Sequence, residues 1–185
     1  YVDMALYGTE KDKKAGLIAQ MDHLFSPDGY YTEGPYYTRY AILPFALLAN
    51  AVNNYKPSLK IFEHRDSILK KALATCLQLT NTNGAFFAFN DALKEKDYTT
   101  NELVTAIGIF WKAYGQNKDW LYVANKQNRV LLNSGGVQIA AMLANKKNIP
   151  ENFNYTAFES TDGDDGKQGG LSILRNGVGN NLTTI

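Results

Sequence analysis

The sequence of 185 residues has few of the side chains that build metal or redox sites. It contains one cysteine and two histidines, so no disulfide can form within the chain and no His or Cys pair has metal-ligand spacing. Cys76 lies in an apolar run and is expected to be a small buried side chain. His23 and His64 are expected at the surface or near helix ends. We therefore expect these residues to bind no metal or other cofactor.

The sequence also lacks a strong charge of either sign and a long apolar run. The formal net charge is +1, with 20% charged and 45% hydrophobic residues. This composition is typical of a globular protein and gives no reason to expect binding to nucleic acid or insertion into a membrane. The length allows one core and the start of a second domain.

Apolar residues recur at helical spacing through most of the first 150 residues. Pro44 is expected to kink or break one helix, the glycines at 135 and 136 to divide another, and Thr99 or Thr100 to cap a third. The predicted helices cover Met4 to Phe25, Tyr36 to Val52, Ile61 to Leu79, Asn101 to Tyr114, and Trp120 to Leu143.

The pattern changes after Pro150. Residues 154–160 alternate like a strand, the acidic and glycine-rich residues 162–170 predict a loop, and residues 171–175 predict another strand. A lone hairpin is barely stable in water, so we expect the sheet to continue beyond Ile185. We interpret both ends of the sequence as internal to a longer protein.

Two short segments resemble each other. SerProAspGlyTyrTyr at 26–31 and ThrAsnGlyAlaPhePhe at 82–87 each follow an apolar helix, and Gly29 lies 55 positions before Gly84. A repeat of that length is typical of stacked helical hairpins, which bury their apolar faces against their neighbours. A plain helical bundle is the alternative topology.

Residues 26–40 form the most informative segment, with five tyrosines, Glu33 and Arg39 in a loop that leads into a helix. Tyr36 and Tyr40 would lie on one helix face, with Tyr37 on the adjacent strip. Composition alone favours packing at the rim of a core, because aromatic clusters pack more often than they catalyse.

The run AspGlyTyrTyrThrGluGlyProTyrTyrThrArgTyr resembles the Asp-Gly, Glu-Gly, tyrosine-rich loop of the heparinase II/III-like polysaccharide lyases, which include alginate and heparin lyases. GlyGlyLeuSerIleLeuArgAsnGly at 169–177 resembles the first strand of the β-sandwich domain of that group. The resemblance implies a mainly α chain: residues 1–150 as the C-terminal half of an (α/α) toroid of helical hairpins, and 151–185 as a linker and the start of a β-sandwich.

The resemblance also implies β-elimination at a uronic acid. Such an enzyme neutralises the sugar carboxylate, removes the C5 proton and protonates the departing O4 oxygen. A tyrosine can serve as base when ionised and as acid when neutral. The family's tyrosine follows the Glu-Gly pair, which makes Tyr37 the first candidate and Tyr40 the second, with Tyr36 not excluded.

Two further residues of the loop are candidate substrate-binding groups. Glu33 is expected to orient the loop through hydrogen bonds rather than act as a base. Arg39 is expected either to hold a uronate carboxylate in a forked pair or to be a solvated helix residue.

The sequence departs from the family in one respect. The Asn and His that neutralise the carboxylate, and the metal ligands of the sheet domain, have no counterpart here. The resemblance places them before Tyr1 and after Ile185, with a divalent metal in that further β domain. It also implies an acidic polysaccharide substrate and a secreted or periplasmic protein, and we expect the isolated chain to be inactive.

Two other functions fit the same residues. The first is an inverting glycoside hydrolase with Asp28 and Glu33 as its acid and base, which would hydrolyse the glycan without forming a double bond. The second is a helical-repeat module that binds a partner and catalyses nothing.

Overall fold

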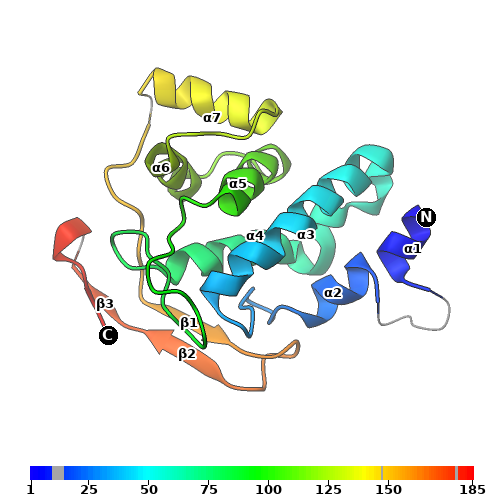
Figure 1. The fold of residues 1–185 in the computed structure, drawn as a ribbon, viewed down its shortest axis with the longest axis horizontal. Helices are drawn as coiled ribbons and strands as arrows, with labels where there is room; N and C mark the ends of the chain where they lie inside the picture. Colours follow the sequence, from blue (N-terminus) through cyan, green and yellow to red (C-terminus); the bar gives the residue numbers. More distant parts are fainter. Residues whose placement is uncertain (10–14, 147, 178) are drawn as a thin grey trace.

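The chain folds into a helical body followed by short strands towards its C-terminal end (Figure 1). The structure is a computed structural model and describes residues 1–9, 15–146, 148–177 and 179–185. The predicted mainly helical fold class with a few strands is confirmed, while the toroid and the domain boundary stay predictions. The α-helices are α1 (Val2–Tyr7), α2 (Leu17–His23), α3 (Pro35–Tyr55), α4 (His64–Gln78), α5 (Asn101–Tyr114), α6 (Lys118–Gln127) and α7 (Ser134–Ala144), the 3-10 turns are η1 (Pro57–Leu59), η2 (Ile61–Glu63) and η3 (Gly179–Asn181), and the strands are β1 (Phe158–Thr161), β2 (Gly170–Ile173), β3 (Arg175–Asn176) and β4 (Thr183–Thr184).

The helices stack as successive pairs. α3 packs against α5, and α5 packs in turn against α7. α4 lies against α3, and α6 lies against α5 and α7, so each pair covers the apolar face of the next (Figure 1). This stacking places the loop before α3 close to the loop and helix that follow α4.

The core lies where these helices meet. Trp111 and Trp120 are each 2% exposed, and Phe110 lies 6.4 Å from Trp120 between ring centroids. Cys76 is buried, as predicted, and burial raises the pKa of its thiol. Full burial of a large apolar side chain contributes about 1.5–3 kcal/mol each, so this cluster holds the helix pairs together.

Several predicted helix boundaries are wrong. The helix predicted from Met4 to Phe25 is two helices, α1 and α2, with residues 10–14 outside the described part. Gly8 (φ 77°) and Gly16 (φ 98°), in the left-handed region, end α1 and precede α2. Pro44 does not break α3, which continues through it from Pro35 to Tyr55 with the proline on the exposed side.

Two further helix predictions also need correction. The helix predicted from Ile61 starts as η2, and α4 contains left-handed residues at Arg65, Asp66 and Ser67. The helix predicted over Trp120 to Leu143 is divided before the glycines, which lie instead in the first turn of α7. A Cβ on Gly135 would lie 2.1 Å from the carbonyl oxygen of Gly108, so the absence of a side chain lets α7 approach α5 closely. Thr100 is the N-cap of α5 by position but makes no side-chain cap hydrogen bond.

The two similar segments form the same turn. Phe25 bridges Tyr31, and Thr80 bridges Phe86, in both cases antiparallel. The amide of each turn glycine donates to the carbonyl three residues earlier, at 2.9 Å for Gly29 and 2.8 Å for Gly84. The repeat of 55 residues is therefore present in the backbone.

The strands form a hairpin that lies against these turns. β1 pairs with β2 antiparallel, with Phe158 opposite Ile173, and the predicted first strand begins only at Phe158. A small apolar cluster holds the hairpin to the helical body, formed by Tyr30, Leu79 and Ile173 with Phe87, Phe89, Phe158 and Leu171.

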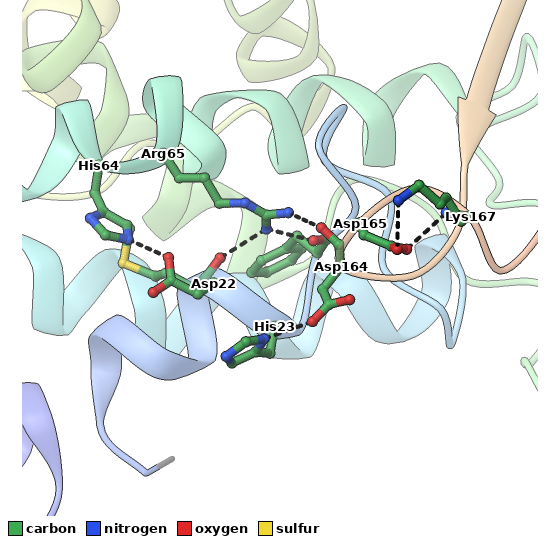
Figure 2. A network of polar contacts seen from close by, with 9 residues as sticks. Asp22, His23, His64, Arg65, Asp164, Asp165 and Lys167 are labelled. Carbon is green, nitrogen blue, oxygen red and sulfur yellow. Dashed lines mark hydrogen bonds and ion pairs between the residues drawn. The ribbon is translucent and has the colours of Figure 1, made fainter. Parts of the chain in front are cut away.

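Polar contacts fix the loop between β1 and β2 (Figure 2). Arg65 donates to main-chain carbonyls at the end of α2 and to the carbonyl of Asp164. His23 Nδ1 lies 2.7 Å from Asp164 Oδ2, and His64 Nε2 lies 2.7 Å from Asp22 Oδ1. Both histidines therefore pair with carboxylates near the surface, and the acidic loop is tied to α2 as a connecting segment.

Candidate active site

The tyrosine-rich segment forms the start of α3. Gly34 has φ 86°, which favours glycine, and it is the N-cap of the helix that begins at Pro35. Tyr36 and Tyr40 then lie one turn apart, with 5.8 Å between ring centroids, and Tyr37 lies 4.9 Å from Tyr36. The predicted clustering of the three rings on adjacent strips of one helix is present.

The three rings differ in their access to solvent. Tyr36 is 6% exposed, Tyr37 is partly buried, and Tyr40 is 47% exposed. The cluster is therefore not sealed in apolar packing. Its outer edge is open to a ligand at Tyr40.

Arg39 lies beneath this cluster and is itself buried, with 3% exposure. Its guanidinium carbon lies 3.7 Å from the centroid of the Tyr40 ring and 4.6 Å from that of Tyr36. Its Nη1 donates to Glu102 Oε1 on α5 at 3.0 Å, while its buried Nε has no hydrogen-bond partner in the described part of the chain. The interpretation of Arg39 as a solvated helix residue is wrong, because α5 and the tyrosine rings cover it. Its predicted contact with a uronate carboxylate stays a prediction.

The environment of Tyr40 favours its ionised form. The neighbouring Tyr36 and Arg39 side chains, together with the positive charge of Arg39, lower the pKa of its phenol below the ordinary value, while desolvation and the negative charge of Glu102 oppose this in part. A phenol with a lowered pKa is a better base near neutral pH than an ordinary tyrosine.

Tyr37 has the opposite environment. Its hydroxyl donates to Asp91 Oδ2 at 3.1 Å, in the loop before α5. Desolvation, this hydrogen bond and the negative charge of Asp91 raise the pKa of its phenol. Tyr37 therefore keeps its proton, as a general acid must.

Glu33 lies at the exposed entrance to the helix. Burial of the Tyr31 ring, together with the neighbouring Glu33 carboxylate, raises the pKa of Tyr31 to about 12. The carbonyl of Glu33 accepts from Asn90 Nδ2 at 3.3 Å, and Phe89 packs next to Gly34. These contacts are of the kind expected of a loop-orienting residue, and any contact with substrate stays a prediction.

Asp28 is not placed as a general acid. Its carboxylate accepts hydrogen bonds from Ser26, Ser160 and Thr161, including the Thr161 amide at 2.8 Å. Burial by itself would raise its pKa, but these hydrogen bonds together lower it. A general acid needs a raised pKa, so the arrangement disfavours the inverting hydrolase and favours a structural role between the turn and β1.

Two residues of the site were not found from the sequence. Asp91 contacts Tyr37 and Glu102 contacts Arg39 from the next repeat, more than 50 positions along the chain. The only signal was the repeat itself, which predicted that neighbouring units would stack but not which side chains would meet.

The described residues offer no metal site and no membrane span. In residues 1–9, 15–146, 148–177 and 179–185, no group of three or more His, Cys, Asp or Glu side chains could hold a metal ion. Within the same ranges, no helix is both long and apolar enough to cross a membrane.

Comparison with known proteins gives a consistent result. No protein-family model matches the chain. It is 47% identical over 174 residues to a protein of Stenotrophomonas maltophilia (strain K279a) named alginate lyase. The aligned region is 94% of this chain and 23% of that protein. It is 45% identical over 180 residues to a protein of Saccharophagus degradans (strain 2-40) named exo-oligoalginate lyase. The aligned region is 97% of this chain and 24% of that protein. The chain thus spans about a quarter of the length of these relatives, and nearly all of it is similar to a segment of two proteins named as alginate-cleaving lyases.

Proposed function

We propose that the chain is part of a polysaccharide lyase that cleaves alginate or a similar uronate-containing glycan by β-elimination. The observation that carries the proposal is its identity of 45–47%, over more than nine tenths of its length, to the two lyases. This chemistry needs groups that give and take protons near a positive charge, and the segment with the tyrosine cluster contains such tyrosines and Arg39.

Two tyrosines have the properties of a base and an acid. Tyr40 is exposed beside the Arg39 guanidinium and takes the proton from C5 of the uronate. Tyr37 keeps its proton and donates it to the departing O4 oxygen. Environments that move two pKa values apart are typical of an acid and base pair. This assignment makes Tyr40 the base, although the sequence alone had favoured Tyr37.

The reaction balances without another reactant. The base removes the proton from C5, the electron pair forms the C4–C5 double bond, and the C4–O4 bond breaks. The leaving oxygen receives the proton from Tyr37, and solvent restores both tyrosines. Tyr36 and Glu33 lie next to Tyr37 and are proposed to contact the substrate.

The remaining parts of the proposal concern the whole protein. The (α/α) toroid, the β-sandwich and groups that neutralise the carboxylate belong to the longer protein that the relatives' lengths suggest. A polymeric substrate outside the cell would require secretion or a periplasmic location.

Product analysis tests the proposal. The natural full-length protein is incubated with alginate in water labelled with heavy oxygen, and products are followed by ultraviolet absorbance and mass spectrometry. Elimination gives absorbing unsaturated ends and no label from water. Hydrolysis would give labelled reducing ends without the absorbance, and that result would refute the proposal in favour of the hydrolase. An absence of cleavage products from alginate and from other uronate glycans would favour the binding module.

A further inference from the structure

The buried ion pair between Arg39 and Glu102 joins two repeats of the fold at the candidate site. Arg39 lies on α3, and Glu102 lies in the first turn of α5. The side chains are 4% and 18% exposed, and Nη1 lies 3.0 Å from Oε1. A charge buried to this degree costs several kcal/mol in lost hydration unless it is paired, so the pair has a fixed geometry.

The guanidinium of this pair contacts the aromatic rings rather than solvent. It lies over the Tyr40 ring at 3.7 Å and over the Tyr36 ring at 4.6 Å. Glu102 therefore restrains Arg39, and Arg39 restrains the exposed Tyr40. Among the residues that the structure describes, the buried Nε of Arg39 has no hydrogen-bond partner, so the ion pair with Glu102 and the two rings hold this side chain.

We propose that Arg39 and Glu102 are positioning residues of the proposed lyase site, which hold the Tyr40 ring and set the charge around its hydroxyl from the neighbouring repeat. The inference rests on the proposed function and deepens it. It differs from the prediction that Arg39 binds a uronate carboxylate, because it requires Arg39 to act through Tyr40.

The titratable and charged groups around Tyr40 and Arg39 come from three helices. α3 supplies Tyr36, Tyr37 and Arg39, α5 supplies Glu102, and α4 supplies the buried Cys76, on which the charge of Arg39 acts. Arg39 and Glu102 are the two charged groups that act on Tyr40, and they have opposite signs. Removing one or the other must therefore change the ionisation of Tyr40 in opposite directions.

The test uses Glu102→Gln and Arg39→Gln in the natural full-length protein. Glu102→Gln leaves the arginine charge without its counter-charge, so the limb where activity rises with pH shifts to lower pH. Arg39→Gln removes the favourable charge, so the same limb shifts to higher pH, and kcat at neutral pH falls about tenfold or more as a charge-assisted contact is lost. Glu63→Gln is the matched control, because it removes a carboxylate from an exposed pair with Lys60.

A titration of the Tyr40 phenol by carbon NMR of labelled tyrosine gives a second readout without substrate. The Tyr40 signal is identified by its loss in Tyr40→Phe. Opposite shifts for the two variants support the inference. Unmoved titrations, or shifts in the same direction, overturn it even if the wild type forms unsaturated products. Opposite shifts in a protein that forms no unsaturated product would instead refute the proposed function and leave the pair's effect on Tyr40 intact.

Arg39→Lys separates positioning from substrate binding, and it also serves if Arg39→Gln does not fold. The lysine keeps the charge but loses the planar group that contacts both rings. A lower kcat with KM within about threefold supports positioning, since uniform substrate binding affects KM instead. A raised KM with unchanged kcat would show that Arg39 holds the substrate directly and would overturn the inference.

Discussion

The turns at 25–31 and 80–86 have the same backbone but different partners. In the first, Asp28 accepts hydrogen bonds from the β1 residues Ser160 and Thr161. In the second, the corresponding residue is Asn83, whose side chain accepts from the amide of Ala85 within its own turn at 3.0 Å. The backbone of the repeat is thus set by a helix end and a glycine, while the function of each copy depends on one side chain and on the segment that follows.

The segments after the two turns differ in the same way. The first leads through Glu33 and Gly34 directly into the tyrosines of α3. The second continues through a longer loop that carries Asp91 and ends at α5 with Glu102. One repeat therefore supplies the candidate catalytic tyrosines and Arg39, and the next supplies the carboxylates of Asp91 and Glu102.

The largest expected effect on stability is in the turn glycines. A Cβ at Gly29 would lie 2.4 Å from the main-chain carbon of Lys71, and one at Gly84 would lie 2.4 Å from the Tyr98 ring. We expect Gly29→Ala to lower the free energy of unfolding by about 3–5 kcal/mol and Gly84→Ala by less, since a ring can move more readily than a helix backbone. Urea unfolding measures both.

Gly115→Ala is the control for these variants. Gly115 has φ 86°, and no described atom lies within 4 Å of an added Cβ. The variant therefore reports the backbone strain alone, about 1–2 kcal/mol. A cost for Gly29→Ala no larger than this would contradict the close approach of the first turn to α4.

Asp28 and Asn83 provide the next comparison. We expect Asp28→Ala to destabilise the protein by about 1–3 kcal/mol, because the buried Ser160 and the neighbouring Thr161 of β1 lose their acceptor, and Asn83→Ala by about 1 kcal/mol or less. Equal effects in urea unfolding would show that Asp28 does not clamp β1.

The pH dependence of Asp28 has a definite sign. Its folded pKa is lowered, so its stabilisation is present above the unfolded value of about 3.9 and is lost as the pH falls through the folded pKa. The difference in stability between wild type and Asp28→Asn should therefore be constant near neutral pH and shrink in acid. A difference that grows in acid would contradict the lowered pKa.

Removing the charge of Asp91 should have a smaller effect, and this effect is on activity rather than on stability. Asp91→Asn keeps a hydrogen-bond acceptor for Tyr37 but removes the charge that helps to raise its pKa. We expect kcat near neutral pH to change by less than about threefold, because the hydroxyl stays oriented. The limb where activity falls as Tyr37 ionises should move to lower pH. A pH–rate profile with an unmoved limb would refute the role of Tyr37 as the acid.

The smallest effect is expected at the exposed pair of Lys60 and Glu63, whose side chains are each 68% exposed. Glu63→Gln should change the free energy of unfolding by less than about 0.5 kcal/mol and leave kcat unchanged. Thermal unfolding and the absorbance assay measure this. A large effect would mean that charge removal anywhere on these helices disturbs the site.

The sequence predicted features that depend on neighbouring residues. The helix from Asn101 to Tyr114, the repeated turns and the tyrosine cluster all follow from local spacing. It failed where tertiary packing decides, as at Gly135, which allows α7 to approach α5 rather than ending a helix. The contacts of Arg39 with Glu102 and of Tyr37 with Asp91 join separate repeats, and no pattern along the chain indicates which side chains will meet.

The central claim is that the Tyr40 phenol takes a proton from a uronic acid, and one substitution tests it most directly. Tyr40→Phe removes only the hydroxyl, and Tyr55→Phe, at a ring 71% exposed at the other end of α3, is the matched control. In the natural full-length protein on alginate, we expect Tyr40→Phe to lower kcat for unsaturated product by about 100- to 10,000-fold and Tyr55→Phe to leave it unchanged. Wild-type turnover by Tyr40→Phe would contradict the account.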